Sequence, residues 1–267
     1  MKLVELIENK RRKGYIQPIA ESLVGQEIII SAISKSLFVD QLALKGGVVM
    51  YNISKDARRA SRDIDFDFIR YDISKDDSID AFIKLLDKKC KEYTIKRSED
   101  IEKLHQEDYE GKRTYVEISD SSYRLKVKLD IGVHTLFVFE QQSMEFFVSH
   151  NNEGIIVKVN PVEQIIAEKL YSLVKLGVAS ERYRDIYDIY FLLDKPYDKT
   201  LIRQGLELLI RFGKNHMNSL EDLFDNLDDV FNSKLWRKGL SSSKSDWLNV
   251  NNDDEVIKKI EALLNVL

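Results

Sequence analysis

The chain has 267 residues, of which 43% are hydrophobic and 10% aromatic, which is enough for one large or two packed domains and excludes global disorder. Its single cysteine, Cys90, excludes an internal disulfide and any metal site built from several cysteines, and suits a reducing, cytoplasmic setting. The net charge of -4 argues against the strongly basic surface of most nucleic-acid binders, although local basic patches remain open at residues 10–13, 58–62 and 88–91.

No stretch of the sequence predicts a membrane contact. Residues 1–13 lack the long apolar region and the cleavage site of a signal peptide, and no run is long and apolar enough to span a bilayer.

The first half of the chain mixes helical and strand periodicities. Apolar spacing predicts helices at residues 20–42, 48–53 and 77–93, a short apolar piece at 41–45, a strand at 63–69, strand-like segments through 94–150 that include 126–131 and 144–148, and a turn at 151–154.

The second half predicts only helices. Asn160 and Pro161 are typical of a helix start, with Asn160 as the cap and Glu163 completing a capping arrangement. Further helices are expected at residues 161–175, 182–193, 199–215, 219–230 and 253–266, with a loop at 241–245. The chain is therefore an α+β protein with a mixed core over residues 1–159 and an all-helical part over 160–267.

The strand at 63–69 carries the most informative pattern. Asp63, Asp65 and Asp67 alternate with apolar residues, so the three carboxylates share one face. Adjacent carboxylates repel each other, and a bound Mg²⁺ removes that cost while it holds substrate phosphates. The alternative is an amphipathic strand whose solvent face happens to be acidic, which the D-x-D spacing alone would favour.

Two further features support a phosphate-handling site. Gly46 and Gly47 stand before a short helix, where backbone can approach a phosphate, although a plain strand-to-helix turn is the better explanation of the two glycines taken alone. Asp130 lies between Leu129 and Ile131, which would face the core, so it shares a face with lysines at 126 and 128. Asp130 is explained equally well as a third metal ligand or as the partner of a lysine or another basic residue in a cross-strand salt bridge.

The helices after residue 160 carry unusual charges. Lys169 falls within an apolar stripe, so it either snorkels along the helix or points into an anion site. Asp185 and Asp188 are neighbours on the next helix, where local pairing of Arg184 with Asp188 is the alternative to a role in a site.

The order of these motifs resembles the AbiEii/AbiGii family of nucleotidyl transferases. The matching segments are Leu44-Lys45-Gly46-Gly47, Arg59-Ala60-Ser61-Arg62-Asp63-Ile64-Asp65-Phe66, Leu129-Asp130-Ile131, Pro161 to Leu170 and Arg184-Asp185-Ile186-Tyr187-Asp188. They cover most of the chain, and the last seventy or so residues carry no such motif. The chain has Gly-Gly where many related transferases have Gly-Ser, so backbone must replace the missing hydroxyl at the phosphate.

The resemblance implies a DNA polymerase β-like nucleotidyltransferase fold, one or two Mg²⁺ ions and a nucleoside triphosphate. It implies that metal is held by Asp63, Asp65 and Asp130, the last of which would activate the acceptor hydroxyl. It also implies that the triphosphate is contacted by Gly46, Gly47 and Lys169, and by Arg59 and Ser61 unless these support the strand. Either Asp185 or Asp188 would support the site, and residues 160–267 would complete it.

Members of this family are toxins that are paired with an antitoxin and act in abortive phage infection, and some add nucleotides to the 3′ end of tRNA. The resemblance therefore implies a tRNA acceptor. The near-neutral charge keeps open a transferase that modifies a protein or an aminoglycoside-like small molecule, as well as a nucleotide-binding module without catalysis. A metal-dependent phosphohydrolase would need clustered histidines, whereas His105, His134, His150 and His216 are scattered.

Overall fold

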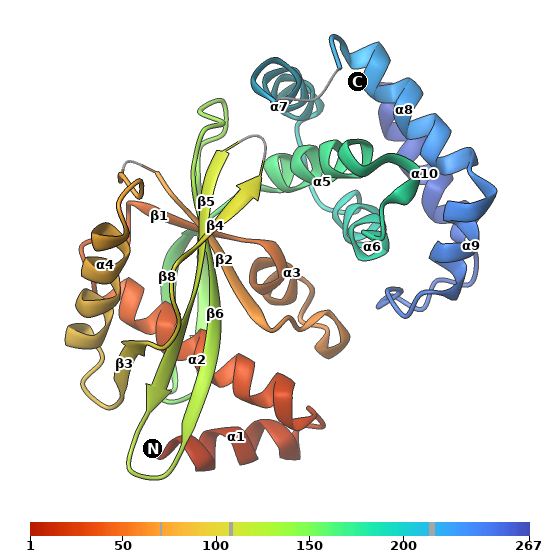
Figure 1. Ribbon diagram of the computed structural model, residues 1–267. Coiled ribbons are helices and arrows are strands. Elements are labelled where there is room, and N and C mark those ends of the chain that lie inside the picture. Colours follow the sequence, from red (N-terminus) through yellow and green to blue (C-terminus); the bar gives the residue numbers. More distant parts are fainter. Residues whose placement is uncertain (70, 107–108, 214–216) are drawn as a thin grey trace. The chain divides into compact units, whose positions relative to one another are not determined.

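The computed structural model describes residues 1–69, 71–106, 109–213 and 217–267. The chain divides into two compact units, coloured by sequence in Figure 1. Unit 1 comprises residues 1–135 and 141–160, and unit 2 comprises residues 136–140 and 161–267. The end of the predicted helix at 199–215 and His216 lie outside the described residues.

Unit 1 is built on a mixed sheet whose strands run in the order β3-β5-β6-β2-β1-β8-β7, with β4 paired to β5. The strands are β1 (Leu42–Lys45), β2 (Asp63–Phe68), β3 (Thr94–Arg97), β4 (Glu102–Gln106), β5 (Tyr109–Ser119), β6 (Arg124–Val133), β7 (Gln142–Val148) and β8 (Glu153–Val159). The two central pairs differ in direction, because β1 is antiparallel to β2 whereas β2 is parallel to β6.

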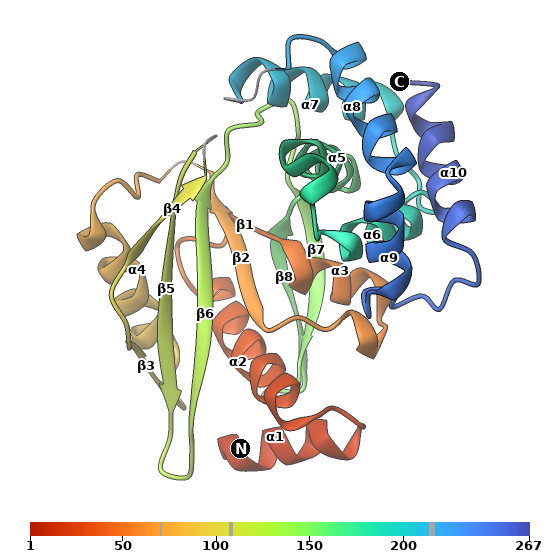
Figure 2. The ribbon, with the colours of Figure 1, turned by 45° about the vertical axis from the view of Figure 1, so that its right-hand side comes forward.

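The helices of unit 1 are α1 (Leu3–Arg12), α2 (Gln17–Ser34), α3 (Gly46–Ser54), the short 3₁₀ turn η1 (Ala57–Arg59) and α4 (Asp76–Lys89). Figure 2 shows α2 running along the sheet, and it contacts β2, β6, β7 and β8. The packing is close enough that a Cβ on Gly25 would stand 2.3 Å from a methyl group of Val127.

The prediction for α2 was wrong at its end. The helix stops at Ser34 and not at residue 42, because Ser36 donates a hydrogen bond to the carbonyl of Ile33 and accepts one from the amide of Phe38. The amphipathic helix α1 was not predicted, and it lies in the region that was weighed as a signal peptide and, at residues 10–13, as a basic patch.

The alternation predicted for β2 is confirmed. Ile64, Phe66 and Phe68 are fully buried on the core side, where the two Phe rings pack edge to face and meet the ring of Phe82 from α4. This apolar cluster stabilises the strand that presents the aspartates on its other face.

Unit 2 is helical, as predicted. Its elements are α5 (Val162–Leu176), the turn η2 (Gly177–Ala179), α6 (Tyr183–Leu192), α7 (Lys199–Phe212), α8 (Leu220–Asn232), α9 (Lys234–Ser242) and α10 (Asp253–Leu264). Helix α9 was not predicted, and it takes in the first two residues of the expected 241–245 loop because Ser233 caps its start and Leu240 lies in the core.

The capping prediction at the start of α5 was also wrong. The helix begins at Val162, so Asn160 lies one residue too early to cap it. The backbone N–H of Asn160 donates instead to the carbonyl of Leu44 and so extends the sheet. Glu163 accepts a hydrogen bond from the backbone of Asp198 at 2.9 Å and so ties α5 to the start of α7.

No strand was predicted after the turn at residues 151–154, but β8 runs over Glu153–Val159 and so begins within that turn. None of the helices in the described part of the chain has the length and apolarity needed to cross a membrane.

Candidate active site

Three of the predicted carboxylates meet on neighbouring strands of unit 1. Asp65 on β2 is the Cα partner of Asp130 on β6, and Asp63 precedes Asp65 by two residues on the same face. The parallel pairing of β2 with β6 sets this register, and the buried Leu129 and Ile131 hold Asp130 on that face. The fold therefore brings together side chains that lie more than sixty residues apart in the sequence.

The environment of Asp65 disfavours its charge. Burial raises the pKa of Asp65 to about 6, the nearby charge of Asp130 and the weaker influence of Asp63 act in the same direction, and Lys45 opposes them. Lys45 is engaged elsewhere, in an ion pair with Asp67 at 2.7 Å. Within the described residues, the carboxylate of Asp65 makes no hydrogen bond or ion pair, so its charge is poorly compensated.

Unlike Asp65, Asp63 and Asp130 each form an ion pair with a basic side chain of unit 1. Arg113 on β5 donates to both oxygens of Asp130, at 2.7 and 2.8 Å. Lys128 lies 2.5 Å from Asp63 and 3.8 Å from Asp130. The salt bridge considered for Asp130 thus exists, mainly to an arginine on the neighbouring strand.

A divalent cation is the group implied at this position. The donor set fits Mg²⁺, because carboxylate oxygens are its preferred protein ligands and the carboxylates of Asp65 and Asp130 stand side by side on paired strands. Within the described residues, however, no three acidic, histidine or cysteine side chains are gathered as a ready metal cage, since Arg113 and Lys128 draw two of the carboxylates to themselves. Metal binding would therefore compete with these two ion pairs.

The two glycines lie against this carboxylate group. Gly46 begins α3 with φ at +65°, and a Cβ there would stand 2.3 Å from a carboxylate oxygen of Asp65. A Cβ on Gly47 would stand 2.4 Å from the Cβ of Ser61 and 3.3 Å from Nη1 of Arg59. Only glycine fits both positions, so the N-terminus of α3 is held beside Asp65.

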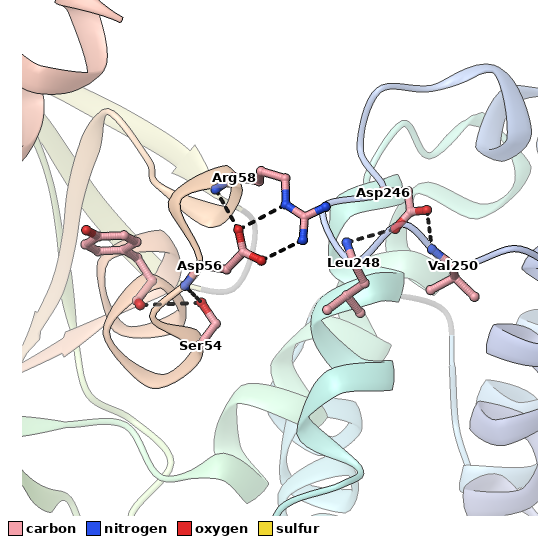
Figure 3. Close-up of polar contacts among 7 residues, drawn as sticks. Ser54, Asp56, Arg58, Asp246, Leu248 and Val250 are labelled. Carbon is pink, nitrogen blue, oxygen red and sulfur yellow. Dashed lines mark hydrogen bonds and ion pairs between the residues drawn. The ribbon is translucent and has the colours of Figure 1, made fainter. Parts of the chain in front are cut away.

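Arg59 and Ser61 come from the turn that precedes β2. Arg59 is buried, and its turn is capped by Asp56, whose carboxylate accepts hydrogen bonds from the backbone and side chain of Arg58 (Figure 3). The Arg58 contacts hold the pKa of Asp56 below its usual value. Gln26 of α2 donates to the carbonyls of Ser61 and Asp63, at 3.0 and 3.1 Å, and so fixes the entry to β2.

In unit 2, Lys169 and both aspartates of α6 form one cluster. Lys169 makes an ion pair with Asp185 and a second one with Asp188, at 2.8 Å. Asp188 is completely buried, and its other oxygen accepts a hydrogen bond from the indole N–H of Trp247 at 3.0 Å. Arg182 also approaches Asp185, at 3.4 Å. Asp188 is therefore the interior anchor of Lys169, and Asp185 is its more accessible partner.

Sequence reasoning missed three members of these clusters. Arg113 reaches Asp130 through strand pairing, and Gln26 reaches the backbone carbonyls of Ser61 and Asp63 through helix packing, which no local pattern encodes. Trp247 lies in the segment without motifs, where a large aromatic residue between serine- and asparagine-rich stretches was the only available signal.

Comparison with known proteins gives one family. The model of the family described as nucleotidyl transferase AbiEii toxin, type IV TA system, matches residues 28–264. Among curated proteins, none matches the chain.

Two solved structures from Helicobacter pylori resemble it. One is the protein JHP933, with 15% identity, a TM-score of 0.46 and coverage of 94% of this chain and 92% of that one. The other is described as a proposed nucleotidyltransferase, with 16% identity, a TM-score of 0.47 and coverage of 94% and 95%.

Proposed function

Because the match over residues 28–264 shows that this chain belongs to the AbiEii family of nucleotidyl transferase toxins, we propose that it transfers a nucleotide from a nucleoside triphosphate to an RNA acceptor. As a member of this family, the protein is a nucleotidyltransferase of a type IV toxin–antitoxin system, and a cognate antitoxin is its implied partner. The acceptor that we propose is the 3′ end of tRNA, with arrest of translation during phage infection as the outcome.

The observation that carries this proposal is the register that sets Asp65 beside Asp130, next to Gly46. We propose that Asp63, Asp65 and Asp130 hold Mg²⁺, which would neutralise charge on the reacting phosphate. Asp130, once released from Arg113, would accept the proton of the acceptor hydroxyl.

At the Gly46-Gly47 motif the triphosphate would be bound by backbone N–H groups, because this chain lacks the serine hydroxyl of the related Gly-Ser motif. Among the described residues no side chain caps the start of α3, so the helix presents its first amides and the positive end of its dipole, and glycines at 46 and 47 let this start lie against Asp65 and Ser61. Arg59 and Ser61 support that start from the side.

The second group that we assign to the triphosphate is Lys169. Its ammonium group would neutralise phosphate charge, and its two carboxylate partners would keep it charged and in place. The role of Asp188 in this proposal is structural support. Lys169 would exchange its ion pair with Asp185 for a contact with the phosphate.

The test is incubation of the pure protein with Mg²⁺, each labelled nucleoside triphosphate in turn, and total bacterial tRNA. Asp65→Asn is the control, because it keeps the shape of the side chain and removes its charge. Label on tRNA with the native protein alone would support the proposal and identify the nucleotide.

Two other outcomes would redirect the proposal. Label on protein or on a small acceptor would keep the chemistry and discard tRNA. Absence of transfer to any acceptor, with triphosphate still bound, would favour a nucleotide-binding module.

A further inference from the structure

We propose that Trp247, in the part of the chain without recognised motifs, is a positioning residue for Lys169 and acts through Asp188. The inference rests on the proposed function, because it assigns a purpose to the Lys169 group in triphosphate binding. It adds a third layer to that group, in which an indole orients a buried carboxylate and the carboxylate orients the lysine.

The first step is the hydrogen bonding of Asp188. One carboxylate oxygen accepts from the indole N–H of Trp247 at 3.0 Å, and the other lies 2.8 Å from the ammonium of Lys169. Asp188 is completely buried, so water cannot replace either partner at little cost. Both contacts therefore help to fix the direction of its carboxylate.

The second step is that the chain around Trp247 is built to hold it. The carboxylate of Asp246 accepts hydrogen bonds from the backbone amides of Leu248 and Val250, at 2.9 and 2.7 Å, as Figure 3 shows. Asn249 adopts the left-handed conformation, with φ at +56°, that this tight turn needs. Trp247 is 3% exposed, and its ring packs 5.2 Å from that of Phe191 on α6.

The third step is a contrast with the other tryptophan of the chain. Trp236 is as deeply buried, in the same unit, and packs against the rings of Tyr183 and Phe231. Its indole nitrogen has no hydrogen-bond partner among the described residues. Both tryptophans therefore fill the core, but only Trp247 donates to Asp188, and a comparison of the two separates packing from positioning.

The experiment measures binding of inorganic tripolyphosphate with Mg²⁺ by calorimetry, so that no nucleotide has to be chosen. The variants are Trp247→Phe, Trp236→Phe, Lys169→Gln, and Lys169→Gln combined with Trp247→Phe, each checked for folding by circular dichroism. The amide introduced by Lys169→Gln can still donate to Asp188, which limits the structural cost of losing the charge. In the Trp236→Phe protein, Trp247 is the sole tryptophan and its fluorescence gives a second readout of binding.

We expect Lys169→Gln to weaken tripolyphosphate binding at least tenfold and Trp247→Phe to weaken it by about three- to tenfold, the range for a hydrogen bond to a charged group that acts indirectly. Trp236→Phe should stay within about twofold of the native protein. In the Lys169→Gln background, Trp247→Phe should have no further effect, because the two changes act through one ammonium group.

The failures are distinguishable. If Lys169→Gln binds tripolyphosphate as tightly as the native protein, the assignment of Lys169 in the proposed function is wrong. If Lys169→Gln weakens binding but Trp247→Phe does not, or if both tryptophan variants weaken it equally, the positioning role is overturned and the function stands. Should Trp247→Phe not fold, unchanged Trp247 fluorescence in the Trp236→Phe protein on saturation with tripolyphosphate would count against the inference.

Discussion

Asp65 and Asp130 face each other as Cα partners on the parallel strands β2 and β6, and they are compensated unequally. Asp130 holds the guanidinium of Arg113 through both oxygens, whereas Asp65 has no ion-pair partner among the described residues. Burial and, next to it, the charge of Asp130 raise the pKa of Asp65 to about 6, so the electrostatic cost of the group falls on Asp65.

The first prediction concerns stability and pH. The pKa of Asp65 is about 6 in the folded chain and about 3.9 when unfolded, so the folded state binds more protons between these values and stability falls as pH rises through them. Asp65→Asn removes this loss. We expect it to raise the free energy of unfolding by up to about 3 kcal/mol at pH 8 and to give no gain at pH 4, in urea titrations at both pH values.

The same variant tests the cation. Mg²⁺ at millimolar concentration should raise the melting temperature of the native protein at pH 8 and leave that of Asp65→Asn unchanged, because ligand binding stabilises only a state that binds it. Equal stabilisation of both proteins would remove Asp65 from the metal site.

The second prediction concerns Arg113. Arg113→Met leaves Asp130 without its main cation, so we expect the metal-free protein to lose about 1–3 kcal/mol of stability. Because the arginine competes with the metal for the same oxygens, affinity for Mn²⁺ should rise several-fold, as measured by electron paramagnetic resonance. Lys128→Met is the matched comparison, since it releases Asp63 from its cation in the same way. Weaker Mn²⁺ binding in Arg113→Met would show that the arginine shapes the metal site and does not block it.

The third prediction concerns Gly46. Gly46→Ala adds a Cβ that would overlap a carboxylate oxygen of Asp65, at a backbone φ of +65°. We expect loss of nucleotide transfer and a cost of about 1–3 kcal/mol in stability. Gly14→Ala is the control, because Gly14 also has positive φ but open space around it. It should lose about 1 kcal/mol from strain and keep full activity; a similar loss of activity in both would point to instability and not to the site.

The fourth prediction concerns Lys169. Removal of this side chain takes the ammonium group away from the buried carboxylate of Asp188, so Lys169→Ala should cost about 3 kcal/mol of stability as well as activity. The double variant Lys169→Met with Asp188→Asn removes both charges. It should recover most of the lost stability in thermal unfolding while nucleotide transfer stays low. Recovery of transfer as well would mean that Lys169 serves only to neutralise Asp188.

The sequence by itself determined the alternation of β2, the helical second half and the family-specific order of motifs, because strand and helix periodicity and short-range spacing are local properties. It also identified Asp63, Asp65 and Asp130 as candidate site residues, since a carboxylate within an apolar strand needs a cation or hydrogen-bond donors to compensate its charge. It misjudged the end of α2 and the start of α5, where side-chain hydrogen bonds and the sheet extension at Asn160 override propensity.

Only the tertiary structure decided which charges meet. The register of β2 with β6 and of β5 with β6 pairs Asp65 with Asp130 and Asp130 with Arg113, and the packing of residues 246–250 on α6 brings Trp247 to Asp188. These contacts join segments separated by dozens of residues, and a one-residue slip of a strand would turn each side chain to the opposite face. Local sequence carries no information on such a slip, whereas burial of the Phe66 and Phe68 face selects a single register.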